Sequence, residues 1–206
     1  MNVARPYEIF SHRLDTEALV ALARTTRPLP ARQIWRLSGQ GSERGVRLAL
    51  QRLVTHGVVE SQAAGRAELY TLNRQHLAAP IAEQIAGLRG AMFDRLRATI
   101  GAWETPPFHA SVFGSAARGD GDTGSDIDLL VVRPAGTDEE DERWRGQLDE
   151  LVEALRRWTG NDVSLAELSA EDARRLRTGR APITKELLSD AVDLAGVPAR
   201  RLVQGR

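Results

Sequence analysis

The segment that most constrains the fold runs from Ser125 to Val132 and reads Ser-Asp-Ile-Asp-Leu-Leu-Val-Val, two aspartates opening an apolar stretch. The apolar stretch predicts a buried strand. Because alternate residues of a strand share a face, Asp126 and Asp128 would project together, with Cα atoms about 6.5–7 Å apart. Two carboxylates this close repel each other unless a cation lies between them. The pair therefore predicts a site for Mg²⁺ or Mn²⁺, hard cations that also bind nucleotide phosphates.

A second element precedes this strand by a few residues. Residues 108–113 read as a short strand, and Gly114-Ser115-Ala-Ala-Arg118-Gly119 follows at a predicted strand-to-helix junction. Free backbone N–H groups at the start of a helix attract phosphate oxygens. Gly114 would permit close approach of a ligand, and the Ser115 hydroxyl would add a donor. Together with the two aspartates, the junction predicts a site for a metal ion and a nucleotide.

The combination Gly-Ser-x-x-Arg-Gly, a short polar linker and Ser-Asp-x-Asp-Leu-Leu-Val-Val resembles the signature of minimal nucleotidyltransferases of the DNA polymerase β-like superfamily. The resemblance covers residues 85–195. It implies that Gly114 and Ser115 hold the β- and γ-phosphates of ATP or another nucleoside triphosphate, and that Asp126 and Asp128 bind Mg²⁺. Arg118 either neutralises triphosphate charge or pairs with Asp120 or Asp122.

The same resemblance implies a third carboxylate on a later strand. The segment from Trp158 to Leu165 reads as that strand and makes Asp162 the candidate, with Glu167 as the second choice. Asn161 and Ser164 depart from the Val-Asp-Leu-Val pattern of many relatives. The expected role of the third carboxylate is to bind a second metal ion and to accept the proton of the attacking hydroxyl.

Other interpretations of this region fail on context. Residues 119–124 spell G-x-G-x-x-G, but a dinucleotide-binding motif needs a strand before it and a helix after it, the reverse of the order expected here. Residues 120–124 resemble the start of a calcium loop, yet Val131 occupies the place of its last glutamate. Lys185 is the only lysine, and no Gly-Lys-Ser/Thr is present, which excludes a P-loop.

The N-terminal part of the chain has a different pattern. Helices are predicted at 14–24, 31–37 and 42–56, and a β-hairpin at 58–72 with Arg66 at its tip. Over residues 12–76 this order resembles the winged helix-turn-helix domain of bacterial regulators, whose third helix enters the major groove of duplex DNA. The residues expected to contact DNA are Arg44, Arg47, Gln51 and Arg66. The alternative is a solvated arginine-rich face on a domain that serves protein contacts or dimerisation.

An apolar stripe at steps of three and four residues predicts a helix from residue 80 to 103. Three uses remain open for it: a connecting helix, the seam of a homodimer, or the first helix of the second domain. We place the domain boundary at residue 80, which assigns 1–80 to the winged helix-turn-helix domain and 81–206 to the nucleotidyltransferase domain.

Charge and composition agree with two domains of different use. Residues 1–80 hold 11 arginines against 6 acidic residues, a net charge of +5, and residues 81–206 carry −5. The chain lacks cysteine, which excludes disulfides and thiolate zinc sites. It also lacks the apolar run of ~18 residues that a membrane span requires and an apolar secretory segment. We therefore expect a cytoplasmic protein with no membrane partner.

The sequence thus predicts an α+β protein in which a winged helix-turn-helix precedes a polymerase β-like domain with a mixed sheet flanked by helices. The leading hypothesis is a metal-dependent adenylyltransferase that moves AMP from ATP to a hydroxyl of a protein or another acceptor. By association with the resembled families, an antitoxin-type regulator with a toxin as acceptor is the favoured setting. The alternative is a DNA-binding transcriptional regulator whose second domain senses nucleotide without catalysis.

Overall fold

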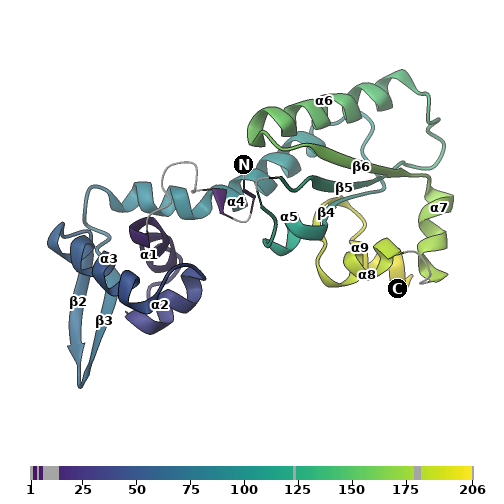
Figure 1. Ribbon diagram of the computed structural model, residues 1–206. Coiled ribbons are helices and arrows are strands. Elements are labelled where there is room, and N and C mark those ends of the chain that lie inside the picture. The colour runs from purple at the N-terminus through teal and green to yellow at the C-terminus, as the bar shows by residue number, and fades with distance from the viewer. Residues whose placement is uncertain (1, 4, 7–13, 123, 179–181, 206) are drawn as a thin grey trace. The chain divides into compact units, whose positions relative to one another are not determined.

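The computed structural model describes residues 2–3, 5–6, 14–122, 124–178 and 182–205. The chain forms two compact units, one from residues 6–88 and the other from residues 1–5 with 89–206 (Figure 1). The helix α4 (Ala79–Gly101) begins in the first unit and ends in the second. The division therefore falls within α4, beyond residue 80. None of the helices in the described ranges combines the length and apolarity needed to cross a bilayer.

The N-terminal unit consists of helices packed beside a small antiparallel sheet. Its elements are α1 (Leu14–Ala23), β1 (Leu29–Pro30), α2 (Ala31–Ser38), α3 (Glu43–Thr55), β2 (Val59–Ala64), β3 (Ala67–Leu72) and the first part of α4. The strand order is β1-β3-β2. The apolar face of α3, with Val46, Leu50 and Leu53, is buried in the core of this unit. The predicted helices and hairpin are thereby confirmed.

Local sequence explains where α3 begins. The side chain of Ser42 accepts a hydrogen bond from the backbone N–H of Gly45 at 3.1 Å, which satisfies one of the free donors of the first turn. The hairpin β2–β3 pairs Ala64 with Ala67, so Gly65 and Arg66 form its tip. Arg66 is exposed there, as the sequence predicts.

The C-terminal unit is built on a mixed sheet. Its elements are the rest of α4, β4 (His109–Phe113), α5 (Gly114–Arg118), β5 (Ile127–Val132), α6 (Glu142–Thr159), β6 (Val163–Leu168), α7 (Ala170–Arg175), a 3₁₀ turn (Leu176–Thr178), α8 (Pro182–Ser189), β7 (Val192–Gly196) and α9 (Ala199–Gln204). The strand order is β6-β5-β4-β7, with β5 and β6 parallel and the other pairs antiparallel. This confirms the predicted α+β class and the mixed sheet flanked by helices.

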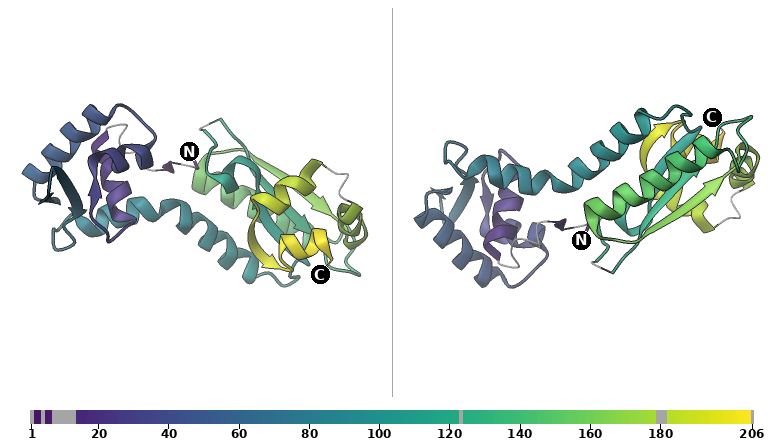
Figure 2. Two further views of the ribbon diagram at one scale, coloured as in Figure 1. Left: turned by 90° about the horizontal axis from the view of Figure 1, so that it is seen from below. Right: turned by 90° about the horizontal axis from the view of Figure 1, so that it is seen from above.

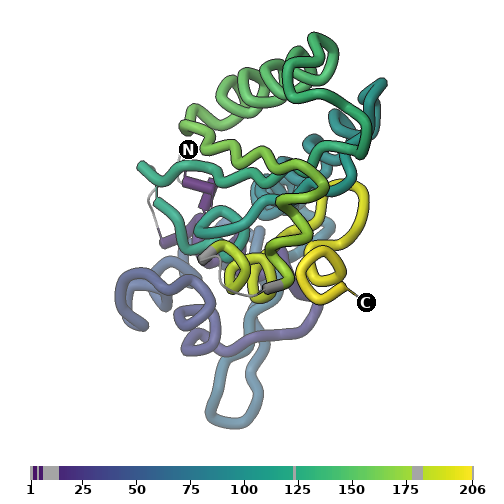
Figure 3. Tube along the Cα trace, turned by 90° about the vertical axis from the view of Figure 1, so that its right-hand side faces the viewer, coloured from purple at the N-terminus to yellow at the C-terminus, as the bar shows by residue number. Residues whose placement is uncertain are grey.

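Helices cover both faces of this sheet. One face packs against α6 and the end of α4, which lie side by side (Figure 2). The opposite face packs against α7, α8 and α9, as Figure 3 shows within this unit. On β5, Ile127 and Leu129 point to the α6 face, whereas Leu130 and Val132 point to the α8 face. Burial on both sides explains why this strand is apolar almost throughout.

One sequence prediction in this unit needs correction. The strand predicted from Trp158 starts only at Val163, because α6 continues to Thr159 and ends at Gly160 in a left-handed cap. Residues 183–195 contain most of α8, all of the link to β7 and the greater part of β7.

Candidate functional site

Asp126 and Asp128 lie at the beginning of β5. Asp126 directly precedes the strand and is exposed, whereas Asp128 is half-buried within it. Asp128 is paired with Phe113, the last residue of β4, and with Ser164 of β6. Because side chains alternate along a strand, Asp128 shares the sheet face of Leu130 and Val132, which is covered by α8. The structure thus places the carboxylate of Asp128 at the end of β4, beside the start of α5.

Gly114 is in close contact with this carboxylate. Its φ of +66° lies in the left-handed region, which residues with a side chain rarely adopt. A Cβ atom added to Gly114 would lie 2.5 Å from Oδ2 of Asp128, closer than carbon and oxygen can approach. Glycine is therefore required here for two reasons, the backbone conformation and the space that Asp128 occupies. The predicted strand-to-helix junction is confirmed, with Gly114 and Ser115 as the first residues of α5.

The polar linker between α5 and β5 folds back over Ser115. A Cβ atom on Gly121 would lie 2.9 Å from the Ser115 hydroxyl, so the linker passes directly beside it. The linker is held by Asp122, whose Oδ1 accepts hydrogen bonds from the Gly124 N–H and the Ser125 hydroxyl, both at 2.9 Å. These bonds lower the pKa of Asp122 and keep it ionised.

A buried asparagine holds the residue that precedes Asp126. The side-chain amide of Asn161 donates a hydrogen bond to the Ser125 carbonyl at 3.0 Å, and Asn161 is only 4% exposed. The backbone N–H of Ile127 donates to the carbonyl of Asp162 at 2.9 Å. Asn161, which in sequence only marked a departure from the family pattern, therefore connects the start of β5 to the start of β6. A polar residue just before a strand carries no signal by itself that would identify this role.

Asp128 has an elevated pKa. The largest cause is burial, which disfavours the charged form, and the next are the negative charges of Glu186 and Asp126, while Arg118 acts in the opposite direction. A carboxylate that is destabilised by burial and by like charges is a suitable partner for a cation. Asp126 and Asp128 offer the hard oxygen ligands that a divalent ion prefers.

Arg118 is held by two carboxylates in this structure. Its guanidinium donates to Asp120 at 3.0 Å and to Asp190 at 3.2 Å. Of the two roles that the sequence left open, the observed contacts include the pairing with Asp120. The contact with Asp190, which follows α8, was not anticipated because the two residues are 72 positions apart.

The third predicted ligand, Asp162, is not brought to the other two. It precedes β6 with its side chain 83% exposed, and it lies 3.8 Å from Arg156 of α6. Among the residues that the structure describes, no three His, Asp or Glu side chains are gathered closely enough to hold a metal ion. The predicted trio Asp126, Asp128 and Asp162 is therefore not formed in this structure.

Glu167, the second choice, serves a structural role. Its Oε1 accepts hydrogen bonds from the Trp144 indole at 2.7 Å and from the Arg133 guanidinium at 2.8 Å. Both the strand alternation and the contact with α6 place it on the face opposite to Asp128. A half-buried carboxylate with these partners is already satisfied.

The residues predicted to contact DNA lie on α3 and at the hairpin tip. Arg44, Gln51 and Arg66 are exposed. Arg47 is exposed as well, but its guanidinium donates to Glu43 one turn earlier at 2.7 Å. That ion pair raises the pKa of Arg47 further.

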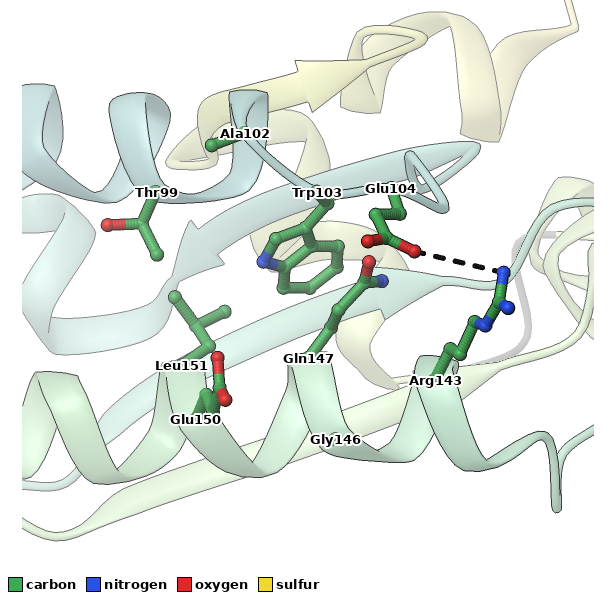
Figure 4. Close-up of a pocket in the computed structure, with 9 residues that line it drawn as sticks. All are labelled: Thr99, Ala102, Trp103, Glu104, Arg143, Gly146, Gln147, Glu150 and Leu151. Carbon is green, nitrogen blue, oxygen red and sulfur yellow. Dashed lines mark ion pairs between the residues drawn. The ribbon is translucent and has the colours of Figure 1, made fainter.

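A cavity lies elsewhere in this unit. Its volume is about 480 Å³, and it lies between the end of α4 and α6, where Trp103, Gln147 and Glu150 contribute to its wall (Figure 4). An ion pair of Glu104 with Arg143 at 3.8 Å borders it. Because α6 covers the face opposite to Asp128, this cavity is separate from the carboxylate site.

Comparison with known proteins shows a similarity for part of the C-terminal unit. Residues 103–195 match the family model described as nucleotidyltransferase domain. The matched segment contains Gly114, Ser115, Asp126 and Asp128, and it supports nucleotidyl transfer as the general activity. No curated protein and no solved structure matches the chain.

Proposed function

We propose that this protein is a metal-dependent nucleotidyltransferase that moves AMP from ATP to a hydroxyl of a protein or another acceptor. The observation that carries the proposal is the contact between the Gly114 backbone and Asp128, which places the start of α5 against a half-buried carboxylate. A phosphate-binding junction and a cation-binding carboxylate then lie side by side within a segment similar to nucleotidyltransferases.

The proposed roles follow from this arrangement. Gly114 and Ser115 would hold the β- and γ-phosphates through backbone N–H groups and the Ser115 hydroxyl. Asp126 and Asp128 would hold one Mg²⁺ or Mn²⁺ ion, since strand alternation would direct both carboxylates to one face and since burial and neighbouring negative charges raise the pKa of Asp128. When bound, the ion screens the charge of the triphosphate and of the pyrophosphate leaving group.

The reaction is a substitution at the α-phosphorus. An acceptor hydroxyl oxygen forms a bond to this phosphorus, the bond to the bridging oxygen of pyrophosphate breaks, and pyrophosphate leaves with the electron pair. The hydroxyl proton must pass to a base. Arg118, at the end of α5, would balance phosphate charge by exchanging one of its carboxylate partners for the nucleotide.

For the N-terminal unit we propose a winged helix-turn-helix that binds duplex DNA. The order of three helices followed by a hairpin, with a third strand beside it, supports this assignment. The exposed residues Arg44, Arg47 and Gln51 of α3 would face the major groove, and Arg66 would reach the backbone from the hairpin. A DNA-binding unit joined to a transferase suits an antitoxin-type regulator that modifies a toxin.

A second candidate function is favoured by one specific observation. Because three carboxylates are not gathered among the described residues, the C-terminal unit would then bind nucleotide without transferring it. The protein would act as a transcriptional regulator whose DNA affinity depends on nucleotide.

Labelled nucleotide distinguishes the two functions. The protein is incubated with α-labelled ATP, Mg²⁺ and a cell lysate, and labelled acceptors are sought; competition by other nucleoside triphosphates tests the preference for ATP. We expect label transfer by the wild type and none by Asp126→Asn or Asp128→Asn, with both variants folded as judged by thermal unfolding. Nucleotide binding without label transfer would support the sensor instead, and near-normal transfer by either variant would exclude that residue from the site.

A further inference from the structure

We propose that Glu186 of α8 is the base that accepts the proton of the attacking hydroxyl, in place of the strand carboxylate that the sequence predicts. This inference rests on the proposed nucleotidyl transfer and adds a catalytic residue to its site. Glu186 lies 60 residues beyond Ser125-Asp126 along the chain, and only the fold relates it to that motif.

The packing of α8 brings the helix to the sheet face of Asp128. Leu187, next to Glu186, is buried in one cluster with Leu130 and Val132 of β5. Asp128 lies on this same face, one alternation before Leu130. Because Leu187 faces the sheet, Glu186 lies on the flank of α8, where it is exposed.

An ion pair shows which way this flank faces. Asp190, whose N–H donates to the Glu186 carbonyl at 2.9 Å, is one helical turn beyond Glu186 and therefore on the same side. Its carboxylate binds Arg118 at 3.2 Å. Since Arg118 ends the helix that Gly114 begins, the flank of α8 that carries Glu186 faces α5 and the site.

The electrostatics of the site agree with this geometry. Of the negative charges that raise the pKa of Asp128, Glu186 has a larger effect than Asp126, which is only two residues away in the chain. This agrees with the position of Glu186 on the flank of α8 that faces α5. Its exposure leaves it accessible to an acceptor hydroxyl that approaches from solvent.

The neighbouring strand offers no carboxylate to Asp128. The residue of β6 that pairs with Asp128 is Ser164, which cannot hold a proton as a base. Asp162 precedes the strand, is exposed, and lies 3.8 Å from Arg156 of α6. The carboxylate that the sequence predicts on β6, Asp162, is thus replaced by Glu186 of α8.

The proposed step is balanced without any further reactant. As the acceptor oxygen bonds to the α-phosphorus, its proton passes to the Glu186 carboxylate, and the electron pair of the broken bond leaves with pyrophosphate. The proton then passes from Glu186 to water. An ionised carboxylate within reach of the hydroxyl is sufficient for this step.

The test compares two carboxylates on the full-length protein. Glu186→Gln removes the base and keeps the size of the side chain, and Asp162→Asn is the matched control at the position that sequence favours. We expect Glu186→Gln to lower the rate of label transfer from α-labelled ATP to the lysate acceptor by about 10²–10⁴-fold, and Asp162→Asn to leave it near wild type. Glu186→Asp, which withdraws the carboxylate, should be intermediate.

A second measurement separates proton transfer from binding. Calorimetric titration with Mn²⁺ and a non-hydrolysable ATP analogue should give wild-type affinity for Glu186→Gln and weakened binding for Asp128→Asn. Transfer by Glu186→Gln at the wild-type rate, or a loss of Mn²⁺ binding equal to that of Asp128→Asn, would overturn the assignment. Loss of transfer in Asp162→Asn alone would return the role to β6. A wild type that transfers no more label than Asp128→Asn would overturn the proposed function and this role with it.

Discussion

At the scale of single residues, the site depends on Gly114, which has no side chain. Gly114 combines a positive φ with a backbone that lies against Asp128, so its replacement has two separable consequences. Strain in the left-handed region affects stability alone, whereas displacement of Asp128 affects the site. A glycine with the same backbone region and open surroundings provides the comparison, and Gly136 has a φ of +88° with no atom within 4 Å of an added Cβ.

We therefore predict different outcomes for Gly114→Ala and Gly136→Ala. Both should lower the free energy of unfolding by about 1–2 kcal/mol through backbone strain, with an additional loss in Gly114→Ala from the contact with Asp128. Only Gly114→Ala should abolish label transfer under conditions in which both variants are folded. Urea denaturation and the labelling reaction measure the two effects, and wild-type transfer by Gly114→Ala would remove the Gly114–Asp128 contact from the site.

At the scale of elements, the site is formed where β5 and β6 begin. The parallel pairing of these strands aligns Ile127 with Val163, and the Asn161 amide ties the preceding turn to the Ser125 carbonyl. Asn73 makes an equivalent bond in the N-terminal unit, where its amide donates to the Gly57 carbonyl at 2.9 Å. Comparison of the two asparagines separates the contribution of such a bond to stability from its contribution to the activity of the site.

We predict that Asn161→Ala and Asn73→Ala each lower the free energy of unfolding, by ~1 kcal/mol for each hydrogen bond that is lost. Only Asn161→Ala should slow label transfer, because it releases the residue that precedes Asp126. Thermal unfolding and transfer rates below the transition provide the measurements. Equal transfer rates in the two variants would show that Asn161 contributes to stability alone.

At the scale of the whole molecule, two units with separate cores carry opposite charge. The basic side chains of the first unit include Arg44, Arg47 and Arg66 on exposed positions. Arg47 has to break its ion pair with Glu43 before it can contact DNA. The loss of this ion pair offsets part of the binding free energy that the new contact provides. Binding of duplex DNA should therefore be dominated by phosphate contacts and should depend on salt.

We predict a fall in log K of ~0.9 per phosphate contact per log unit of salt in fluorescence anisotropy with duplex DNA. Arg66→Ala should flatten this slope and weaken binding to all sequences alike, whereas Arg47→Ala should weaken binding to a preferred site by ~1–3 kcal/mol. Neither should change label transfer.

The control for charge alone is Arg143→Ala, which removes an exposed arginine of the other unit. No binding at low salt would leave the first unit as a docking or dimer module, and loss of transfer in Arg47→Ala would assign its face to acceptor binding.

Sequence by itself determined the features that depend on neighbours in the chain. The apolar run of β5, the strand-to-helix junction at Gly114, and the helices and hairpin of the first unit follow from local periodicity and from residues such as Ser42 that end or begin an element. The prediction that Asp126 and Asp128 project to one side also needs nothing beyond strand alternation. These expectations concern contacts between residues that are close along the chain.

Only the tertiary structure decided which distant side chains complete the site. Asp162 is exposed and lies 3.8 Å from Arg156 of α6, and nothing in the local pattern of β6 reveals this contact. Asp190 contacts Arg118 although the two residues are 72 positions apart in the chain. The contact forms because α8 buries Leu187 on the sheet face of Asp128, and the same packing places Glu186 on the side of α8 that carries Asp190. Such contacts arise from the burial of apolar surface, which selects the packing of a helix by shape and area and not by sequence distance.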